Sequence, residues 1–372
     1  MSAEINKSLN LRAGEWVEVR SKDEILSTLD QQSQFDGLPF MPEMFAFCGS
    51  RLQVYKRAHK TCDTVFPVRG RRMANAVHLA TRCDGRAHGG CQANCLIFWK
   101  EIWLKRVADP SKSGAPAAFD TEGRPNGSES KGGCTESGVL AATRQQTNPP
   151  DSEPVYRCQA TRLPYATTDL GCWDIRQYLE DYSSGNVGIG RMLSGFIYMS
   201  YYGLSKARFG LGKILPWFYD KLYPLWHGSP FPRRTGRIPV GEPTPSRALN
   251  LQPGELVRVR SHAEILQTLN TESKNRGMLF DGEMVPFCGK TYRVLQRVSK
   301  IINEQTGKMQ EMKTPSITLK NVFCQSRYSQ CRLFCPRSIP SYWREIWLER
   351  VSGSARSDAN NELTRRPPAQ RI

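Results

Sequence analysis

The sequence predicts an α+β protein built from two β-rich modules of an internal duplication, which are bridged by a flexible linker and a helical segment. When the chain is shifted by 240 positions, residues 9–60 align with 249–300 without a gap, and 25 of the 52 pairs are identical. Each copy opens with an alternating strand pattern followed by a helix start. The region between the copies changes composition twice. A length of 372 residues suits two or three domains.

The first module covers residues 9–107. Residues 16–20 alternate apolar and polar side chains, which is typical of a half-buried strand. Ser21 followed by Glu24 has the pattern of a capping box, which predicts a short helix that continues to Leu29. Further strands are expected at residues 51–57 and 77–81.

The second module covers residues 249–351 and repeats this pattern. Ser261 and Glu264 form the second capping box. After a divergent middle, the two copies match again where residues 99–107 align with 343–351. Each copy is therefore about 100 residues long, which is the size of a small domain.

Three further segments have distinct compositions. Residues 108–153 are rich in Ser, Gly, Pro, Ala and Thr, and this predicts a flexible linker. Residues 154–230 have helical patterns with many aromatic and basic side chains, and residues 352–372 are expected to be a disordered tail.

The aromatic and basic part of the helical segment, residues 189–226, has three interpretations. Its helices could simply pack against the modules as core. Aromatic side chains interleaved with Lys and Arg also suit a helix in a membrane interface, which would give peripheral membrane contact. Nucleic-acid binding is the third interpretation, because bases stack on aromatic rings and phosphates attract basic side chains.

The net charge of +17, from 52 basic and 35 acidic residues, favours anionic partners. We find no apolar stretch that predicts a secretory signal or a membrane span, so a cytoplasmic location is expected, with peripheral membrane attachment as an alternative. In a reducing compartment, the twelve cysteines are expected to be metal ligands, buried thiols or catalytic groups rather than disulfides.

Both copies keep four cysteines although the loops around them have diverged. Four thiolates are the number that zinc or an iron–sulfur cluster requires, so we predict a metal site in each module. Buried structural thiols and redox chemistry are the alternatives. The predicted ligands are Cys48, Cys83, Cys91 and Cys95 in the first copy and Cys288, Cys324, Cys331 and Cys335 in the second, with Cys62 as a rival ligand.

Histidines distinguish the first copy from the second. His78 and His88 have no histidine counterparts in the second copy. Cys62 as a nucleophile, with His78 or His88 as a base, gives weak catalytic candidates. The simpler explanation is that these histidines are exposed and arose by chance substitution in the first copy. The glutamate shared by both copies, Glu43 and Glu283, is expected to form an internal ion pair, with ligand binding as the alternative.

Three strings carry a resemblance: GEWVEVRS at 14–21, GLPFMPEM at 37–44 and CDGRAHGGCQANC at 83–95. They resemble a family of uncharacterised bacterial proteins, over both modules and residues 173–187. The resemblance implies no activity. The start of each module is also similar to the first strand of SH3-like barrels, which implies by analogy that the modules are SH3-like.

The leading functional prediction is a metal-binding protein with tandem modules, in which zinc or an iron–sulfur cluster is structural and the modules bind or scaffold an unknown protein partner. One alternative is a metal- or iron–sulfur-dependent enzyme that acts on a small molecule through its first module. The other is nucleic-acid binding through basic barrels. Common catalytic motifs are absent from the sequence, so whether the protein is an enzyme stays open.

Overall fold

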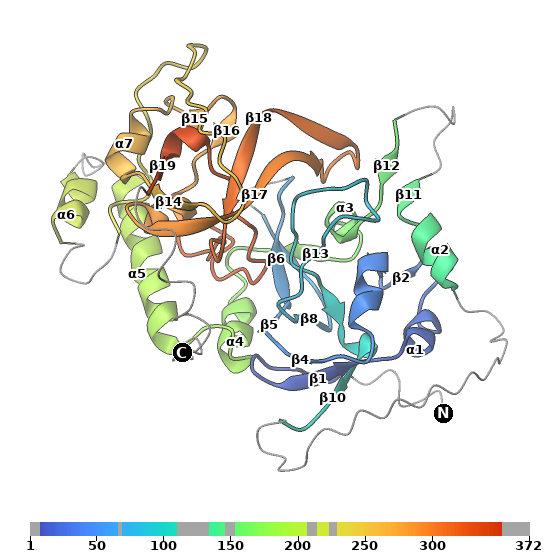
Figure 1. The fold of residues 1–372 in the computed structure, drawn as a ribbon. Helices are drawn as coiled ribbons and strands as arrows, with labels where there is room; N and C mark the ends of the chain where they lie inside the picture. The colour runs from blue at the N-terminus through green and yellow to red at the C-terminus, as the bar shows by residue number, and fades with distance from the viewer. Residues whose placement is uncertain are drawn as a thin grey trace, which may run out of the picture. The chain divides into compact units, whose positions relative to one another are not determined.

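The computed structural model describes residues 8–65, 69–109, 134–145, 153–206, 214–222 and 229–351 (Figure 1). The fold is a mixed α+β arrangement of several small antiparallel sheets, with one sheet that curls into half a barrel. The predicted fold class is thereby confirmed at this level. The predicted tail, 352–372, lies outside the described residues.

The chain forms two compact units that do not follow the order of the sequence. Unit 1 consists of residues 1–186, 300–311 and 330–339, and unit 2 consists of residues 187–299, 312–329 and 340–372. The second sequence module, 249–351, therefore contributes residues to both units. A comparison of sequence copies does not reveal this exchange.

Unit 1 begins with the predicted strand and helix. Strand β1 (Trp16–Val19) pairs antiparallel with β4 (Arg51–Gln53) and β10 (Leu104–Arg106), and its inward side chains are buried. Helix α1 (Lys22–Leu26) starts at the expected capping box, in which the Ser21 side chain accepts from the backbone N–H of Glu24 and the Glu24 carboxylate accepts from that of Ser21.

The other elements of unit 1 are short. The strands are β2 (Gln34–Phe35), β3 (Leu38–Pro39), β5 (Lys56–Arg57), β6 (Lys60–Cys62), β7 (Gly70–Arg72), β8 (Ala76–His78), β9 (Trp99–Lys100), β11 (Arg144–Gln145), β12 (Val155–Tyr156) and β13 (Thr168–Leu170). The helices are η1 (Pro42–Phe47), η2 (Glu101–Trp103), α2 (Glu136–Ala141), α3 (Gln159–Arg162) and α4 (Arg176–Ser183). Three-stranded sheets join β5, β8 and β9, and β13, β7 and β6.

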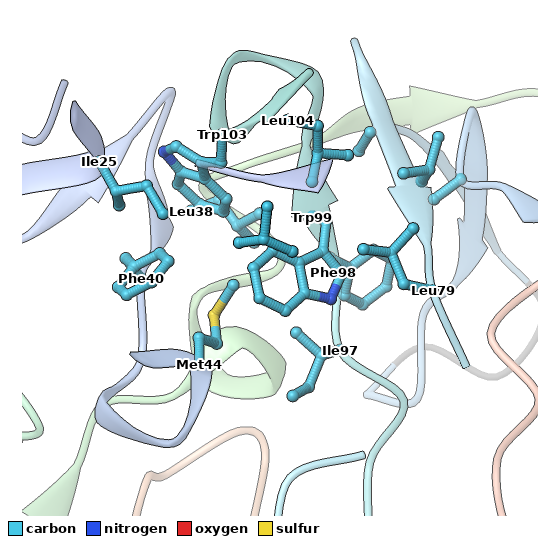
Figure 2. Close-up of a cluster of buried hydrophobic side chains, with 14 of the residues drawn as sticks. Ile25, Leu38, Phe40, Met44, Leu79, Ile97, Phe98, Trp99, Trp103 and Leu104 are labelled. Atoms are coloured by element: carbon cyan, nitrogen blue, oxygen red, sulfur yellow. The ribbon is translucent and has the colours of Figure 1, made fainter. Parts of the chain in front are cut away.

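Two fully buried tryptophans organise the core of unit 1 (Figure 2). Phe40 meets the rings of Trp99 and Trp103 edge-on, with centroids 6.4 and 5.3 Å apart. The indole N–H of Trp103 donates to Thr28 and that of Trp99 to Thr81, so neither donor is left unsatisfied. This core holds η1, the short helix that carries Glu43.

Part of the predicted linker is folded. Residues 134–145 of the segment 108–153 form α2 and β11, and β11 pairs with β12. Val139 on α2 is buried in the core of unit 1, so this stretch gains enough apolar burial to be ordered. The prediction of a flexible linker is therefore wrong for residues 134–145, and most of the remainder lies outside the described residues.

Unit 2 contains local elements that begin 240 positions after their counterparts in unit 1. These are β14 (Leu256–Val259), α7 (His262–Leu266), β15 (Lys274–Asn275), β16 (Met278–Leu279) and η4 (Gly282–Phe287). They are followed by β17 (Thr291–Ile302) and β18 (Met309–Leu319), of which residues 300–302 and 309–311 belong to unit 1, and by η5 (Glu345–Trp347) and β19 (Leu348–Arg350). The sheet order is β18-β17-β14-β19. Strands β17 and β18 are 12 and 11 residues long, whereas the corresponding region of the first copy is divided into short strands.

The helical segment supplies α5 (Ile189–Lys206) and α6 (Ile214–Leu222) to unit 2. Tyr198 on α5 is buried against Phe231 and Tyr328. Within the described residues, none of the helices has the length and apolar character needed to cross a membrane.

Candidate metal centre

Glu43 lies on η1. Met44, the next residue of this helix, is fully buried in the core and so fixes the position of the Glu43 carboxylate (Figure 2). One carboxylate oxygen, Oε1, accepts from the backbone N–H of Ala87 at 3.2 Å and lies 2.8 Å from Nδ1 of His88. The other oxygen, Oε2, is buried and has no hydrogen-bond partner. A buried carboxylate oxygen without a partner is costly, and it is therefore ready to accept a ligand.

A tight loop between Cys83 and Cys91 brings His88 to this carboxylate. Gly85 has a φ of +69°, and a Cβ added there would lie 2.0 Å from the carbonyl oxygen of Cys91. The backbone N–H of His88 donates to the Gly85 carbonyl at 3.0 Å, and that of Cys83 donates to the Cys95 carbonyl at 2.9 Å. Only glycine permits so close an approach of the two arms of the loop.

Glu43, Cys83 and His88 offer one ligand atom each, and these atoms lie within 4.8 Å of one another. A tetrahedral zinc ion, with bonds of about 2.0–2.3 Å, holds its ligands roughly 3–4 Å apart, so a small rotamer adjustment brings the three together. Carboxylate, thiolate and imidazole are all zinc ligands. The group is therefore a candidate metal site.

The hydrogen bonds of His88 leave room for a cation. Its Nε2 lies 3.1 Å from the carbonyl oxygen of Arg157, and because a carbonyl only accepts, Nε2 carries a proton. Nδ1 then faces the carboxylate of Glu43, where two acceptors would repel each other unless a proton or a metal ion lies between them. Metal-binding histidines commonly donate their second N–H to a carbonyl in this way.

The pKa shifts at the site show how the metal-free form is charged. Burial alone raises the pKa of Glu43, but the hydrogen bond and the charge of His88 outweigh burial and hold this pKa below its ordinary value. Burial raises the pKa of Cys83 well above its ordinary value, and the nearby carboxylate of Glu43 adds to this rise. The thiol of Cys83 is therefore protonated without metal, and a bound metal has to displace that proton.

A pocket with a volume of about 40 Å³ lies beside Cys83 and His88. Cys83 and His88 line it together with Cys91, Cys95 and Cys158. Burial raises the pKa of Cys95 to about 12 and that of Cys158 to about 11. The pocket wall thus carries four thiols, and none of the four is in a disulfide.

The predicted first ligand set is only partly brought together. Cys83, Cys91 and Cys95 line the pocket, but Cys48 ends η1, packs against the core and does not line the pocket. Cys158 takes the fourth place instead. Sequence reasoning missed Cys158 because it lies outside the repeat, where comparing the two copies gives no signal.

Cys62 and His78 lie elsewhere in unit 1. The buried thiol of Cys62 is hydrogen-bonded to Cys335, and this bond and burial raise its pKa. His78 is fully buried, with Nδ1 2.8 Å from the carbonyl oxygen of Ile97 and its ring centroid 4.5 Å from that of Phe98. Of the three weak catalytic candidates, His88 is the one that lies at the pocket.

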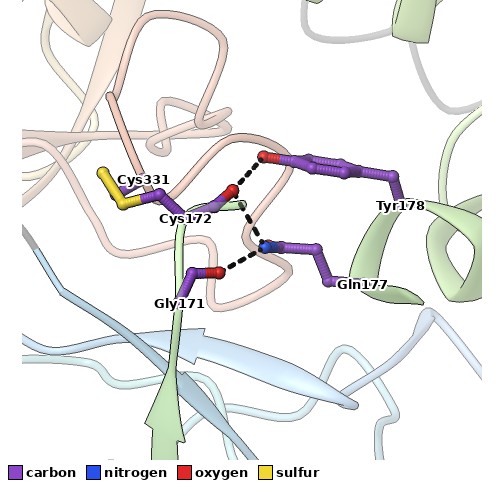
Figure 3. Close-up of a disulfide and its surroundings, with 5 residues drawn as sticks. All are labelled: Gly171, Cys172, Gln177, Tyr178 and Cys331. Carbon is purple, nitrogen blue, oxygen red and sulfur yellow. Dashed lines mark hydrogen bonds between the residues drawn. A yellow bond between two sulfur atoms is a disulfide. The ribbon is translucent and has the colours of Figure 1, made fainter. Parts of the chain in front are cut away.

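Cys331, a predicted ligand of the second copy, forms a disulfide with Cys172 (Figure 3). The carbonyl of Cys172 accepts from the Tyr178 hydroxyl at 3.3 Å and from the Gln177 amide at 3.5 Å, and Gln177 also donates to Gly171. A disulfide sulfur is not a thiolate, so Cys331 is not a metal ligand in this form. The expectation that the cysteines avoid disulfides is wrong for this pair.

The other predicted ligands of the second copy are divided between the two units. Cys288 and Cys324 belong to unit 2, whereas Cys335 belongs to unit 1. The carboxylate of Glu283, the counterpart of Glu43, accepts from the backbone N–H groups of Arg327 and Tyr328 at 2.9 and 2.6 Å. Position 328 corresponds to 88, so the second copy keeps the bond from carboxylate to loop but lacks the imidazole.

Comparison with known proteins gives no match, either to a family model or to a curated protein. The resemblance to an uncharacterised bacterial family stays a prediction. The fold and the site define the chain as a mixed α+β protein that has a candidate metal-binding group in unit 1.

Proposed function

We propose that this protein is a metal-binding protein whose two SH3-like modules act as a binding or scaffolding unit for a protein partner. The observation that supports metal binding most directly is the convergence of Glu43, Cys83 and His88, with one buried oxygen of Glu43 left without a partner. The second copy lacks the corresponding imidazole, so the proposal places this metal in unit 1 alone.

Zinc is the single ion that fits this donor set best. The three ligands come from η1, from the residue before the tight loop and from the loop itself, so a bound ion would cross-link segments that are 45 positions apart in the chain. A ligand that binds only the folded state stabilises it by mass action, and structural zinc can contribute much of the folding free energy of a small module. We therefore propose a structural role for the ion.

Metal analysis of the purified full chain tests this proposal. We expect one zinc per chain and a lower melting temperature after treatment with a chelator. Glu43→Gln should lose the zinc, whereas the matched variant Glu283→Gln in the second copy should keep it. The proposal would be overturned if the purified protein contained no metal and neither zinc nor chelator changed its melting temperature.

An iron–sulfur cluster is the second candidate, and the four thiols that line the pocket favour it. Among the described residues, the group close enough for a single ion is Glu43, Cys83 and His88, and the four thiols do not form such a group. They instead line a pocket with a volume of about 40 Å³. A cluster of several iron and sulfide ions spans wider ligand spacings than one ion does, and four cysteines are its usual ligands.

Arg337 also supports this second candidate. Its guanidinium group is buried, lines the same pocket and donates to Glu304 at 2.8 Å and to the Cys62 carbonyl at 3.1 Å. A positive charge beside the thiols offsets the negative charge of a thiolate-bound cluster. A cluster would add redox chemistry and so favour the enzyme alternative. Anaerobic purification distinguishes the candidates: iron, sulfide and a brown colour indicate a cluster, and colourless protein with zinc indicates the single ion.

A further inference from the structure

The outer faces of α5 and α6 concentrate exposed apolar side chains. Among the described residues, twenty large hydrophobic side chains are exposed, and nine of these lie on the two helices. The exposed side chains are Ile189, Leu193, Phe196, Ile197 and Leu204 on α5 and Ile214, Trp217, Phe218 and Leu222 on α6. Single exposed hydrophobic residues are ordinary, but such a concentration indicates an interaction surface.

Helix α5 has two apolar faces. Met192, Gly195 and Tyr198 recur every three residues and are buried, and Tyr198 contacts Phe231 and Tyr328 of unit 2. The exposed apolar residues of α5 are at positions 189, 193, 196, 197 and 204. In a helix with 3.6 residues per turn, these positions form one stripe on the side opposite the buried face. Packing within the described part of unit 2 accounts for the buried face, whereas the side chains of the stripe are exposed.

Helix α6 packs on α5 through aromatic rings. Tyr201 and Tyr219 have ring centroids 5.7 Å apart, and the Tyr201 hydroxyl donates to the carbonyl of Leu215. Trp217 and Phe218 are each about half exposed. The two helices, which are labelled in Figure 1, are therefore joined by tyrosines, and their exposed hydrophobic side chains are aromatic and aliphatic.

The charge of this segment is positive. Residues 189–222 contain the basic residues Arg191, Lys206, Arg208, Lys213 and Lys221 and the acidic residue Asp220. Asp220 forms an ion pair with Arg234, so its negative charge is compensated. A segment that combines an apolar stripe with a net positive charge complements an anionic lipid surface, because anionic headgroups attract basic side chains.

We infer that α5 and α6 form a docking surface for an anionic membrane. The 18-residue α5 would lie in the plane of the interface, with its stripe at the boundary between headgroups and acyl chains. Tyrosine and tryptophan favour that depth because their rings are apolar and their N–H or O–H groups remain hydrated. The inference is independent of the metal site, because both helices belong to unit 2.

Co-sedimentation of the full chain with vesicles tests the inference. We expect binding to vesicles that contain phosphatidylglycerol, weaker binding to pure phosphatidylcholine, and a decrease as salt is added. The double variant Leu193→Asp/Ile197→Asp should weaken binding by at least about tenfold, because two apolar contacts are replaced by charges. Val240→Asp/Leu279→Asp is the matched control, since it adds the same charge at exposed positions of unit 2 away from the stripe.

Two results would overturn the inference. The first is wild-type protein that does not bind anionic vesicles at low salt. The second is an equal loss of binding in the stripe and control variants, which would mean that net charge alone drives the association. Light scattering tests whether a second copy of the chain binds this surface instead. If the wild-type protein is a dimer, the stripe variant is a monomer and neither binds vesicles, the surface belongs to a second copy of the chain. Circular dichroism of each variant verifies that it is folded.

Discussion

Nδ1 of His88 lies 2.8 Å from Oε1 of Glu43, although 45 positions separate the two residues. The corresponding carboxylate in the second copy, Glu283, contacts backbone N–H groups at Arg327 and Tyr328 instead. Both copies therefore have a carboxylate that accepts hydrogen bonds from the backbone of a loop. Among the described residues, only in the first copy do an imidazole and the neighbouring thiol of Cys83 add to this carboxylate to form a candidate metal site.

His88→Ala should weaken zinc binding by at least about tenfold, because it removes the imidazole ligand. Competition with a chromophoric chelator measures the affinity. Arg86→Ala is the matched control, because this exposed side chain of the same loop pairs with Asp84 outside the site. Equal zinc affinities of the two variants would show that His88 is not a ligand.

Cys158→Ser discriminates between a single ion and a cluster. If the four thiols hold an iron–sulfur cluster, the variant should lose most of its iron and visible absorption after anaerobic purification, since one thiolate ligand is missing. Cys134→Ser, which changes a thiol that does not line the pocket, should keep both. Retention of zinc in Cys158→Ser together with its loss in His88→Ala would assign the single-ion site.

Reduction of the disulfide between Cys172 and Cys331 should destabilise unit 1. The two cysteines are 159 positions apart, so the bond restricts a long loop of the unfolded chain, and its loss should cost about 2–5 kcal/mol. Urea unfolding with and without a reductant measures the change. Cys172→Ser should unfold at the urea midpoint of the reduced wild-type protein, both with and without the reductant. An unchanged wild-type midpoint under reduction would mean that the bond does not contribute.

His78 should make the protein less stable in acid. Burial lowers the pKa of His78 to about 3, and the hydrogen bond to the Ile97 carbonyl opposes this only in part. In the unfolded chain the pKa is about 6.5, so the unfolded state binds a proton that the folded state does not. Stability is therefore fully present above about pH 6.5 and falls as the pH drops toward 3.

His78→Gln should flatten this pH dependence while it keeps a hydrogen-bond donor for Ile97. Urea unfolding between pH 7 and pH 4 compares the slopes of the two proteins. Burial lowers the pKa of His262 to about 4, so this residue contributes in the same direction in both and does not alter the comparison. Identical slopes would show that His78 does not titrate on unfolding.

Asp181→Asn should destabilise unit 1 strongly. Asp181 is fully buried and its Oδ2 lies 2.5 Å from Nζ of Lys60, which is also buried. Burial lowers the pKa of Lys60, and Asp181 opposes this shift. Removing one partner of a buried pair leaves an uncompensated charge, which costs about 3–5 kcal/mol.

Asp169→Asn is the matched control for this effect. Asp169 pairs with Arg71 at 2.8 Å but is largely exposed, so its loss should cost at most about 1 kcal/mol. Denaturant unfolding measures both variants. Similar destabilisation by the two substitutions would contradict the expected importance of burial.

The sequence by itself determined the local elements. The alternation at 16–20 and the capping box at Ser21 and Glu24 depend on neighbouring residues, and the structure contains the strand and the helix that they predict. The same holds for the counterparts 240 positions later. Three pocket thiols, Cys83, Cys91 and Cys95, were identified because they are close together in sequence and recur in the second copy.

Tertiary structure decided the rest. Glu43 meets His88 only because the tryptophan core positions η1 against the glycine loop, and Cys158 reaches the pocket from a segment outside the repeat. The disulfide of Cys331 with Cys172 and the assignment of residues 330–339 to unit 1 depend on chain crossings over long sequence separations. Periodicity detects contacts between residues that are near in sequence, and repeat comparison detects positions that the two copies share. Contacts over long sequence separations depend instead on the packing of the whole chain.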